Sequence, residues 1–83
     1  MIESEFLFVV GQNIAYYRKL QHLTQTDLAK LVDMKQVSVA TIEGGKVGTT
    51  IKTLKRIADV LHIDPQQLLK IPARQNKNSP TKR

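Results

Sequence analysis

Gln36, Val37 and Thr41 are the residues of this chain whose types and spacing could do chemistry. At about 100° per residue they lie on one side of a short helix, and Val39 and Ile42 lie on the other. The apolar side would anchor the helix, so the Gln–Val–Thr row faces outward. A glutamine amide can make two hydrogen bonds with an adenine edge, and a valine can contact a thymine methyl in the major groove of DNA. A single exposed valine is also common on protein surfaces, so the row alone leaves both interpretations open.

Two short helices joined by a tight turn, within residues 24–46, would position this row. The first helix is expected to begin at Thr24, whose side chain can cap free backbone N–H groups, with Asp27 three residues on as in a capping box. The second is expected to begin near Lys35. It would end at the Gly-Gly pair 44–45, because glycine commonly follows the last turn of a helix.

Three further helices are expected to enclose this pair. Apolar residues at helical spacing predict helices over residues 4–21 and 51–61, with Ser4 as the cap of the first. An Asp-Pro start signal at 64–65 predicts a short fifth helix over 66–70. The sequence therefore predicts an all-α fold, and no segment alternates like a strand.

Three positions are interpreted from the backbone conformation that they require. Gly11 lies inside the first expected helix and is interpreted as a tolerated weak point, costing about 1 kcal/mol relative to alanine. His22 and Asp33 follow the first and second helices. Both are expected to take the left-handed conformation, which His, Asn and Asp accept best among residues with a side chain.

Composition limits the classes of protein that this chain can belong to. Its 83 residues are enough for one small domain. It has no cysteine, which excludes disulfides and cysteine-based metal sites and fits a reducing cytoplasm. No apolar run approaches the roughly 18 residues of a membrane span, and the N-terminus does not resemble a secretory signal. We therefore expect a cytoplasmic protein.

The charge is unevenly distributed along the chain. The net charge is +6, of which the last twelve residues, PARQNKNSPTKR, carry +4 because they hold four bases and no acid. This composition cannot bury a core, so we expect a folded domain over residues 1–71 and a disordered basic tail over 72–83. A basic excess favours polyanions such as nucleic acid, although the +2 of the domain is also ordinary for solubility.

An enzyme is not expected. His22 and His62 are isolated, and no second ligand stands at metal-binding spacing. The aspartates at helix starts and turns are explained by capping, which leaves no carboxylate pair for acid–base work. The Gly-Gly-Lys run at 44–46 lacks the other parts of a phosphate-binding loop. No catalytic residue, metal or cofactor is therefore predicted.

A series of residues across positions 8–70 points to a known family. The series comprises Ile14, Arg18, Leu23-Thr24-Gln25, Leu28-Ala29, Val39, Ile42-Glu43, Gly45, Leu54, Ile57-Ala58, Leu61 and Leu68. With these spacings the chain resembles the Cro and lambda-repressor class of helix-turn-helix proteins, also called the xenobiotic-response-element family. The resemblance implies a compact five-helix DNA-binding domain, with helices 2 and 3 as the helix-turn-helix.

The resemblance also implies a function and a set of contacts. It implies a sequence-specific transcriptional regulator, a repressor, that binds a palindromic operator in double-stranded DNA as a homodimer with helix 3 in the major groove. The implied DNA-binding residues are Gln25 on a phosphate, Gln36, Val37 and Thr41 on base edges, and Lys35, Ser38 and Lys46 on bases or backbone at the rim.

Arg18 and Glu43 are implied by the same resemblance to form a structural salt bridge. Glu43 falls on the apolar side of helix 3, where an unpaired carboxylate would be costly. The alternative is that Glu43 is a solvent-exposed acid at the end of its helix.

An interaction protein is the alternative to a regulator whose main partner is DNA. Small members of the family act as antitoxins that also hold a toxin subunit. The apolar N-terminus around Phe6 and Phe8, or the basic tail, could dock such a partner. Membrane association through the tail is not expected, because no amphipathic anchor adjoins it.

Overall fold

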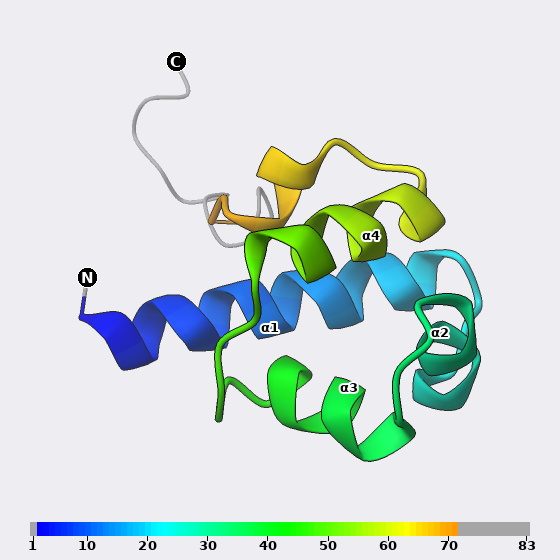
Figure 1. Cartoon of the computed structure of the whole chain (residues 1–83). Coiled ribbons are helices and arrows are strands. Elements are labelled where there is room, and N and C mark those ends of the chain that lie inside the picture. Colours follow the sequence, from blue (N-terminus) through cyan, green and yellow to red (C-terminus); the bar gives the residue numbers. More distant parts are fainter. Residues whose placement is uncertain (1, 72–83) are drawn as a thin grey trace.

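The computed structural model describes residues 2–71, and the predicted tail at 72–83 lies outside this range. Within it the chain forms four α-helices, one 3-10 turn and no strand (Figure 1). The elements are α1 (Glu3–Leu20), α2 (Gln25–Leu31), α3 (Gln36–Glu43), α4 (Ile51–Leu61) and η1 (Pro65–Leu68). The predicted all-α class is confirmed for the described part of the chain.

Helix α1 is the central element around which the others pack. Helix α3 lies on one side of it, α4 and η1 lie on the other, and the N-terminal end of α1 projects beyond α4 (Figure 1). The most deeply buried side chains come from every element and form one core: Ile14, Leu28, Val32, Val39, Ile57, Leu61 and Leu68. The apolar stripes predicted from helical spacing thus meet in the interior.

The predicted fifth helix is wrong, because the chain forms only the 3-10 turn η1 there. Asp64 caps this turn by accepting a hydrogen bond from the Gln66 N–H (3.1 Å). The last carbonyls of a helical turn have no donor within the turn, so that of Leu68 has to be paired from another part of the chain. The buried Asn13 of α1 instead donates to the carbonyl oxygen of Leu68 (2.9 Å). The Asp-Pro pair begins a helical turn as predicted, but the turn ends after four residues.

The predicted cap of α1 at Ser4 is also wrong. The helix begins at Glu3, and Ile2 is the capping residue. The backbone N–H of Ile2 donates to Oε1 of Glu5 (3.3 Å). The Glu5 side chain therefore satisfies one of the free N–H groups at the start of the helix, and the helix begins before Ser4.

The cap of α2 forms as predicted from Thr24 and Asp27. Oγ1 of Thr24 accepts from the Asp27 N–H (3.0 Å), and the Thr24 N–H donates to Oδ2 of Asp27 (2.9 Å). Hydrogen bonding to the Asp27 carboxyl from the Thr24 backbone N–H, and secondarily from the Thr24 side chain, lowers the pKa of that carboxyl because it stabilises the charged form. The start of α2 is therefore fixed by local contacts.

The left-handed conformations predicted for His22 (φ 60°) and Asp33 (φ 58°) are confirmed. His62, which ends α4, adopts the same conformation (φ 61°). At each position the chain reverses within a few residues, and this sharp change of direction requires a positive φ.

Replacing Asp33 with glycine should leave the melting temperature unchanged or raise it slightly. Glycine adopts a positive φ without steric cost, which offsets its greater freedom in the unfolded chain. Thermal unfolding followed by circular dichroism would measure the change. A clear fall in melting temperature would contradict this expectation, since it would mean that the Asp33 side chain stabilises the turn.

Gly11 is not the weak point that the sequence suggested. A Cβ atom added there would meet the carbonyl oxygen of Ile42 and lie 2.5 Å from that of Glu43. The last turn of α3 thus packs directly on the backbone of α1. Glycine at this position is what allows the two helices to approach so closely.

None of the described helices is long and apolar enough to cross a membrane.

Candidate nucleic-acid interface

Helix α3 is fixed by its apolar side, so its opposite side is presented outward. Val39 and Ile42 are buried in the core beside α1 and α2. The tight turn between α2 and α3 passes through Asp33, whose left-handed backbone brings the two helices together. This arrangement of two short packed helices is the geometry that the sequence predicted for the stretch 24–46.

The structure brings Gln36, Val37 and Thr41 to the outward side of α3. Gln36 is exposed, and Val37 is 60% exposed although it is apolar. Thr41 is half-buried, and its hydroxyl donates to the carbonyl oxygen of Ser38 (2.9 Å). That bond engages the Thr41 hydrogen and leaves its oxygen as an acceptor toward a ligand.

The two lysines of the rim lie beyond the two ends of α3, and Ser38 lies within the helix. Lys35 is the residue before the helix, and Lys46 follows it after the two glycines; both side chains are exposed. Ser38 is half-buried. A cation at each end of a short outward helix is the arrangement that a polyanion spanning the helix would need.

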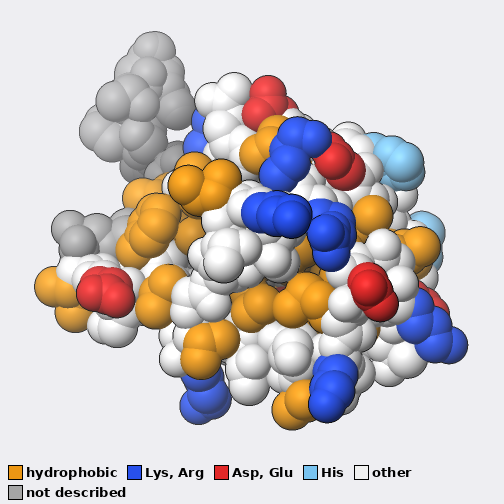
Figure 2. Space-filling view, viewed as in Figure 1, with side chains coloured by type: hydrophobic (Ala, Val, Ile, Leu, Met, Phe, Trp, Pro, Cys, Tyr) orange, Lys and Arg blue, Asp and Glu red, His pale blue; other side chains and the backbone are white. Residues whose placement is uncertain are grey.

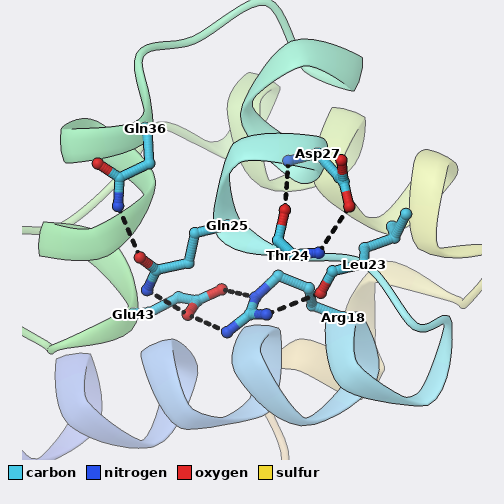
Figure 3. Close-up of polar contacts among 7 residues, drawn as sticks. All are labelled: Arg18, Leu23, Thr24, Gln25, Asp27, Gln36 and Glu43. Carbon is cyan, nitrogen blue, oxygen red and sulfur yellow. Dashed lines mark hydrogen bonds and ion pairs between the residues drawn. The ribbon is translucent and has the colours of Figure 1, made fainter.

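Arg18 and Glu43 form a bidentate ion pair between α1 and α3 (Figure 3). Nε of Arg18 donates to Oε2 of Glu43 (2.7 Å), and Nη2 donates to Oε1 (2.9 Å). The side chains are only 9% and 5% exposed, and Nη1 of Arg18 also donates to the carbonyl oxygen of Leu23 (2.8 Å). The pair therefore ties α1 to the end of α3 and to the loop before α2.

Gln25 connects this ion pair to the outward row. Its Nε2 donates to Oε1 of Glu43 (3.0 Å), and its Oε1 accepts from Nε2 of Gln36 (2.8 Å) (Figure 3). Glu43 can only accept, so the nitrogen of Gln25 must face it and the oxygen must face Gln36. The buried carboxylate of Glu43 therefore fixes the orientation of the Gln25 amide, and the Gln25 amide in turn fixes that of Gln36.

The bridging role of Gln25 was missed by sequence reasoning. The sequence contained one usable signal, since Gln25 and Gln36 stand at the first residues of two consecutive short helices. Packing those helices brings their beginnings together, so two long amides placed there can reach one another.

The remaining candidates for chemistry have structural roles. His22 and His62 end helices in left-handed conformation. The Gln66 backbone lowers the pKa of the Asp64 carboxyl by donating to it in the cap of η1. Within residues 2–71 no group of three metal-ligating side chains comes together.

Comparison with protein families gives a match over most of the folded part. The helix-turn-helix family model HTH_3 matches residues 14–68. This range begins in α1 and ends at η1, so it contains the helix pair and the core around it.

Two curated proteins resemble the chain in sequence. A Bacillus phage phi105 protein, the "ImmF control region 10 kDa protein", is 38% identical over 55 residues, which are 66% of this chain and 61% of that protein. An uncharacterised HTH-type transcriptional regulator of Methanocaldococcus jannaschii is 40% identical over 45 residues, covering 54% of this chain and 68% of that protein. The chain thus aligns with about three fifths of the phage protein.

Solved structures share the fold. The restriction-modification controller protein C.AhdI from Aeromonas hydrophila superposes with a TM-score of 0.72 at 27% identity, covering 75% of this chain and 94% of that one. The hypothetical transcription factor NHTF from Neisseria gives 0.80 at 20% identity, covering 94% and 90% of the two chains. An HTH_3 family transcriptional regulator from Vibrio cholerae gives 0.74 at 23% identity, covering 95% and 40%.

Proposed function

Because the chain belongs to the helix-turn-helix family HTH_3, which its match over residues 14–68 establishes, we propose that it is a sequence-specific DNA-binding transcriptional regulator. Helix α3 lies in the major groove of double-stranded DNA, and its outward row reads base edges. The observation that carries the proposal is the exposed face of α3, where an apolar valine stands in water beside a glutamine whose amide is held in one direction.

Gln36 is the residue that we assign to an adenine. An amide carries two N–H donors and an acceptor oxygen, and one donor of Gln36 is engaged with Gln25. The other donor and the oxygen together match the N7 acceptor and the N6 donor of adenine. Because Gln25 and Glu43 fix the direction of the amide, the reversed pattern of donor and acceptor is disfavoured.

The other predicted residues have roles that follow from their places on α3. Val37 would contact a thymine methyl, and Thr41 would offer its hydroxyl oxygen to a base donor. Lys35 and Lys46 would contact phosphates on either side of the groove, with Ser38 at the rim. For Gln25, the second amide N–H would donate to a phosphate while the first stays on Glu43.

We further propose that the protein represses transcription as a homodimer on a palindromic operator. A two-fold pair would place two α3 helices in successive major grooves about 34–36 Å apart, so that the two half-sites repeat in opposite directions. The names of the phage control-region protein and of the restriction-modification controller protein support a role in controlling expression.

Selection of bound sites from random double-stranded DNA would test the proposal, and alanine variants would test the residues. Gln36→Ala should relax discrimination at one base pair by about 1–3 kcal/mol.

Lys46→Ala should weaken binding to all sequences alike and reduce the salt slope by about 1. Fluorescence anisotropy over a series of single-base operator changes and salt concentrations would separate the two effects.

Lys70→Ala is the matched control for these variants, because Lys70 is an exposed cation that follows η1, on the opposite side of α1 from α3. It should change neither specificity nor the salt slope. If alanine at Gln36, Val37 and Thr41 together left sequence-selective affinity unchanged, α3 would not be the reading element.

A further inference from the structure

The carboxylate of Glu43 determines, through Gln25, which atom of Gln36 faces outward. Glu43 is 5% exposed and accepts from two nitrogens of Arg18, so it cannot turn away from Gln25. Gln25 therefore keeps its nitrogen on Glu43 (3.0 Å) and its oxygen on the nitrogen of Gln36 (2.8 Å). In Figure 3 the side-chain oxygen of Gln36 points away from Gln25. This relay from Glu43 through Gln25 to Gln36 thus ends outward in a hydrogen-bond acceptor.

Turning the Gln36 amide over would break the relay. Its nitrogen would leave the oxygen of Gln25, and two amide oxygens, both acceptors only, would face one another. Gln25 could not restore the bond by turning as well, because its own oxygen would then face the carboxylate of Glu43. The orientation of the Gln36 amide is therefore set before DNA arrives.

The side of the molecule that presents the Gln36 oxygen is basic towards its ends. Lys35 precedes α3 and Lys46 follows it, and both side chains are exposed. Figure 2 shows Lys or Arg side chains towards both ends of its lower edge, where α3 lies in Figure 1, with polar and apolar side chains between them. Phosphates held by these cations would leave a base edge opposite the Gln36 oxygen.

The amino group of adenine supplies the donor that this oxygen needs. In the major groove adenine offers N7 as an acceptor and an N6–H as a donor. Pairing with thymine engages one of the two N6 hydrogens, so only the second hydrogen faces the groove. When N6-methyladenine pairs with thymine, its methyl group takes the place of this second hydrogen. The oxygen of Gln36 then has no donor to accept from.

The methyl group would also collide with the Gln36 oxygen. An N–H···O bond joins heavy atoms about 2.9 Å apart, and a methyl carbon bonded to N6 would lie within that distance. A side chain with no other contact could move aside. Gln36 would have to give up its hydrogen bond to Gln25 to do so.

We propose that this relay makes the protein sensitive to adenine methylation, so that it binds a site whose adenine is unmethylated and is excluded when that adenine is N6-methylated. The inference rests on the proposed function, and it adds the chemical state of the DNA that the protein accepts. A DNA adenine methyltransferase acting on the site would release the protein without changing the base sequence.

Fluorescence anisotropy with two synthetic duplexes tests the inference. Both carry the selected site, and one has N6-methyladenine at the base pair whose discrimination Gln36→Ala relaxes. The wild type should bind the methylated duplex about 10- to 100-fold more weakly, which is the discrimination that one bidentate contact supplies. A third duplex, methylated at an adenine outside the selected site, should bind like the unmethylated one.

Two variants separate the relay from other effects of the methyl group. Gln36→Ala should bind the methylated and unmethylated duplexes equally, because no oxygen remains to oppose the methyl group. Gln25→Ala keeps Gln36 but frees its amide, so the ratio of the two affinities should fall about fivefold, as expected for one ordinary hydrogen bond. A phosphate contact of Gln25 affects both duplexes alike and cancels in this ratio. Lys70→Ala is the matched control and should keep the full ratio.

The inference and the proposed function can fail separately. Equal affinity of the wild type for the two duplexes would overturn the inference and leave a sequence-specific regulator. A penalty that persists in Gln36→Ala would also overturn it, because the methyl group would then act through the shape of the DNA. An unchanged ratio in Gln25→Ala, or a selected site with no adenine that depends on Gln36, would count against it equally. A wild type that selects no sequence would remove the proposed function and the inference together.

Discussion

Glu43→Ala should lower the free energy of unfolding by about 3–5 kcal/mol, which is the usual cost of removing one partner of a buried ion pair. Arg18 is 8% exposed and would be left with the Leu23 carbonyl as its one described hydrogen-bond partner. A stranded guanidinium is costly because it has lost its water without keeping its counter-charge. A typical domain has a free energy of unfolding of about 5–15 kcal/mol, so such a loss is large. Urea denaturation followed by circular dichroism would measure it.

Asp59→Ala is the control for this variant. Asp59 accepts a salt bridge from Lys55 one turn earlier on α4 (2.8 Å), but both side chains are largely exposed. Exposed pairs of this kind contribute about 0.3–0.5 kcal/mol to stability, so the urea midpoint of Asp59→Ala should stay near that of the wild type. Equal midpoints for the wild type and Glu43→Ala would mean that the Arg18–Glu43 pair does not hold α3 to α1.

Thr41→Ala separates stability from DNA binding at the same helix. Within residues 2–71 its hydroxyl bonds only to the carbonyl of Ser38 one turn earlier, so its removal breaks no described hydrogen bond between helices. Glu43→Ala should therefore affect folding first, and Thr41→Ala should affect DNA affinity first.

The parts of the fold that the sequence predicted are those that depend on contacts within a few residues. The cap at Thr24 joins it to Asp27, and the left-handed turns at His22 and Asp33 depend on the backbone of each residue. Helical spacing placed Val39 and Ile42 inward and Gln36 and Val37 outward because the direction of a side chain follows from its position on the helix.

The features that the sequence did not predict depend on residues far apart in the chain. Asn13 binds the carbonyl of Leu68, 55 residues later, at the end of η1. Gln25 reaches Glu43, 18 residues later, which places it inside a network rather than only beside a phosphate. Such contacts become visible only when the packing of the helices is known, since local patterns carry no record of which carbonyl or carboxylate lies opposite.

Gly11→Ala should destabilise the fold by about 3 kcal/mol, at the upper end of the usual cost of overpacking. In an isolated helix the same change would be favourable by about 1 kcal/mol. The structure reverses the sign because the new methyl would collide with the carbonyl oxygens of Ile42 and Glu43. These are backbone atoms in the last turn of α3, so they cannot rotate away as a side chain would. Helix α3 would have to move from α1 and would strain the ion pair between Arg18 and Glu43.

Gly44→Ala is the matched control, because Gly44 lies in the same part of the structure and has ordinary surroundings. A Cβ atom there would lie 3.4 Å from the carbonyl oxygen of Ala40, and the backbone is helical (φ −78°). Its melting temperature should therefore stay near that of the wild type, while that of Gly11→Ala falls. If Gly11→Ala were as stable as Gly44→Ala, α1 and α3 could separate at no cost, and the close approach of these helices would not be what positions the outward row.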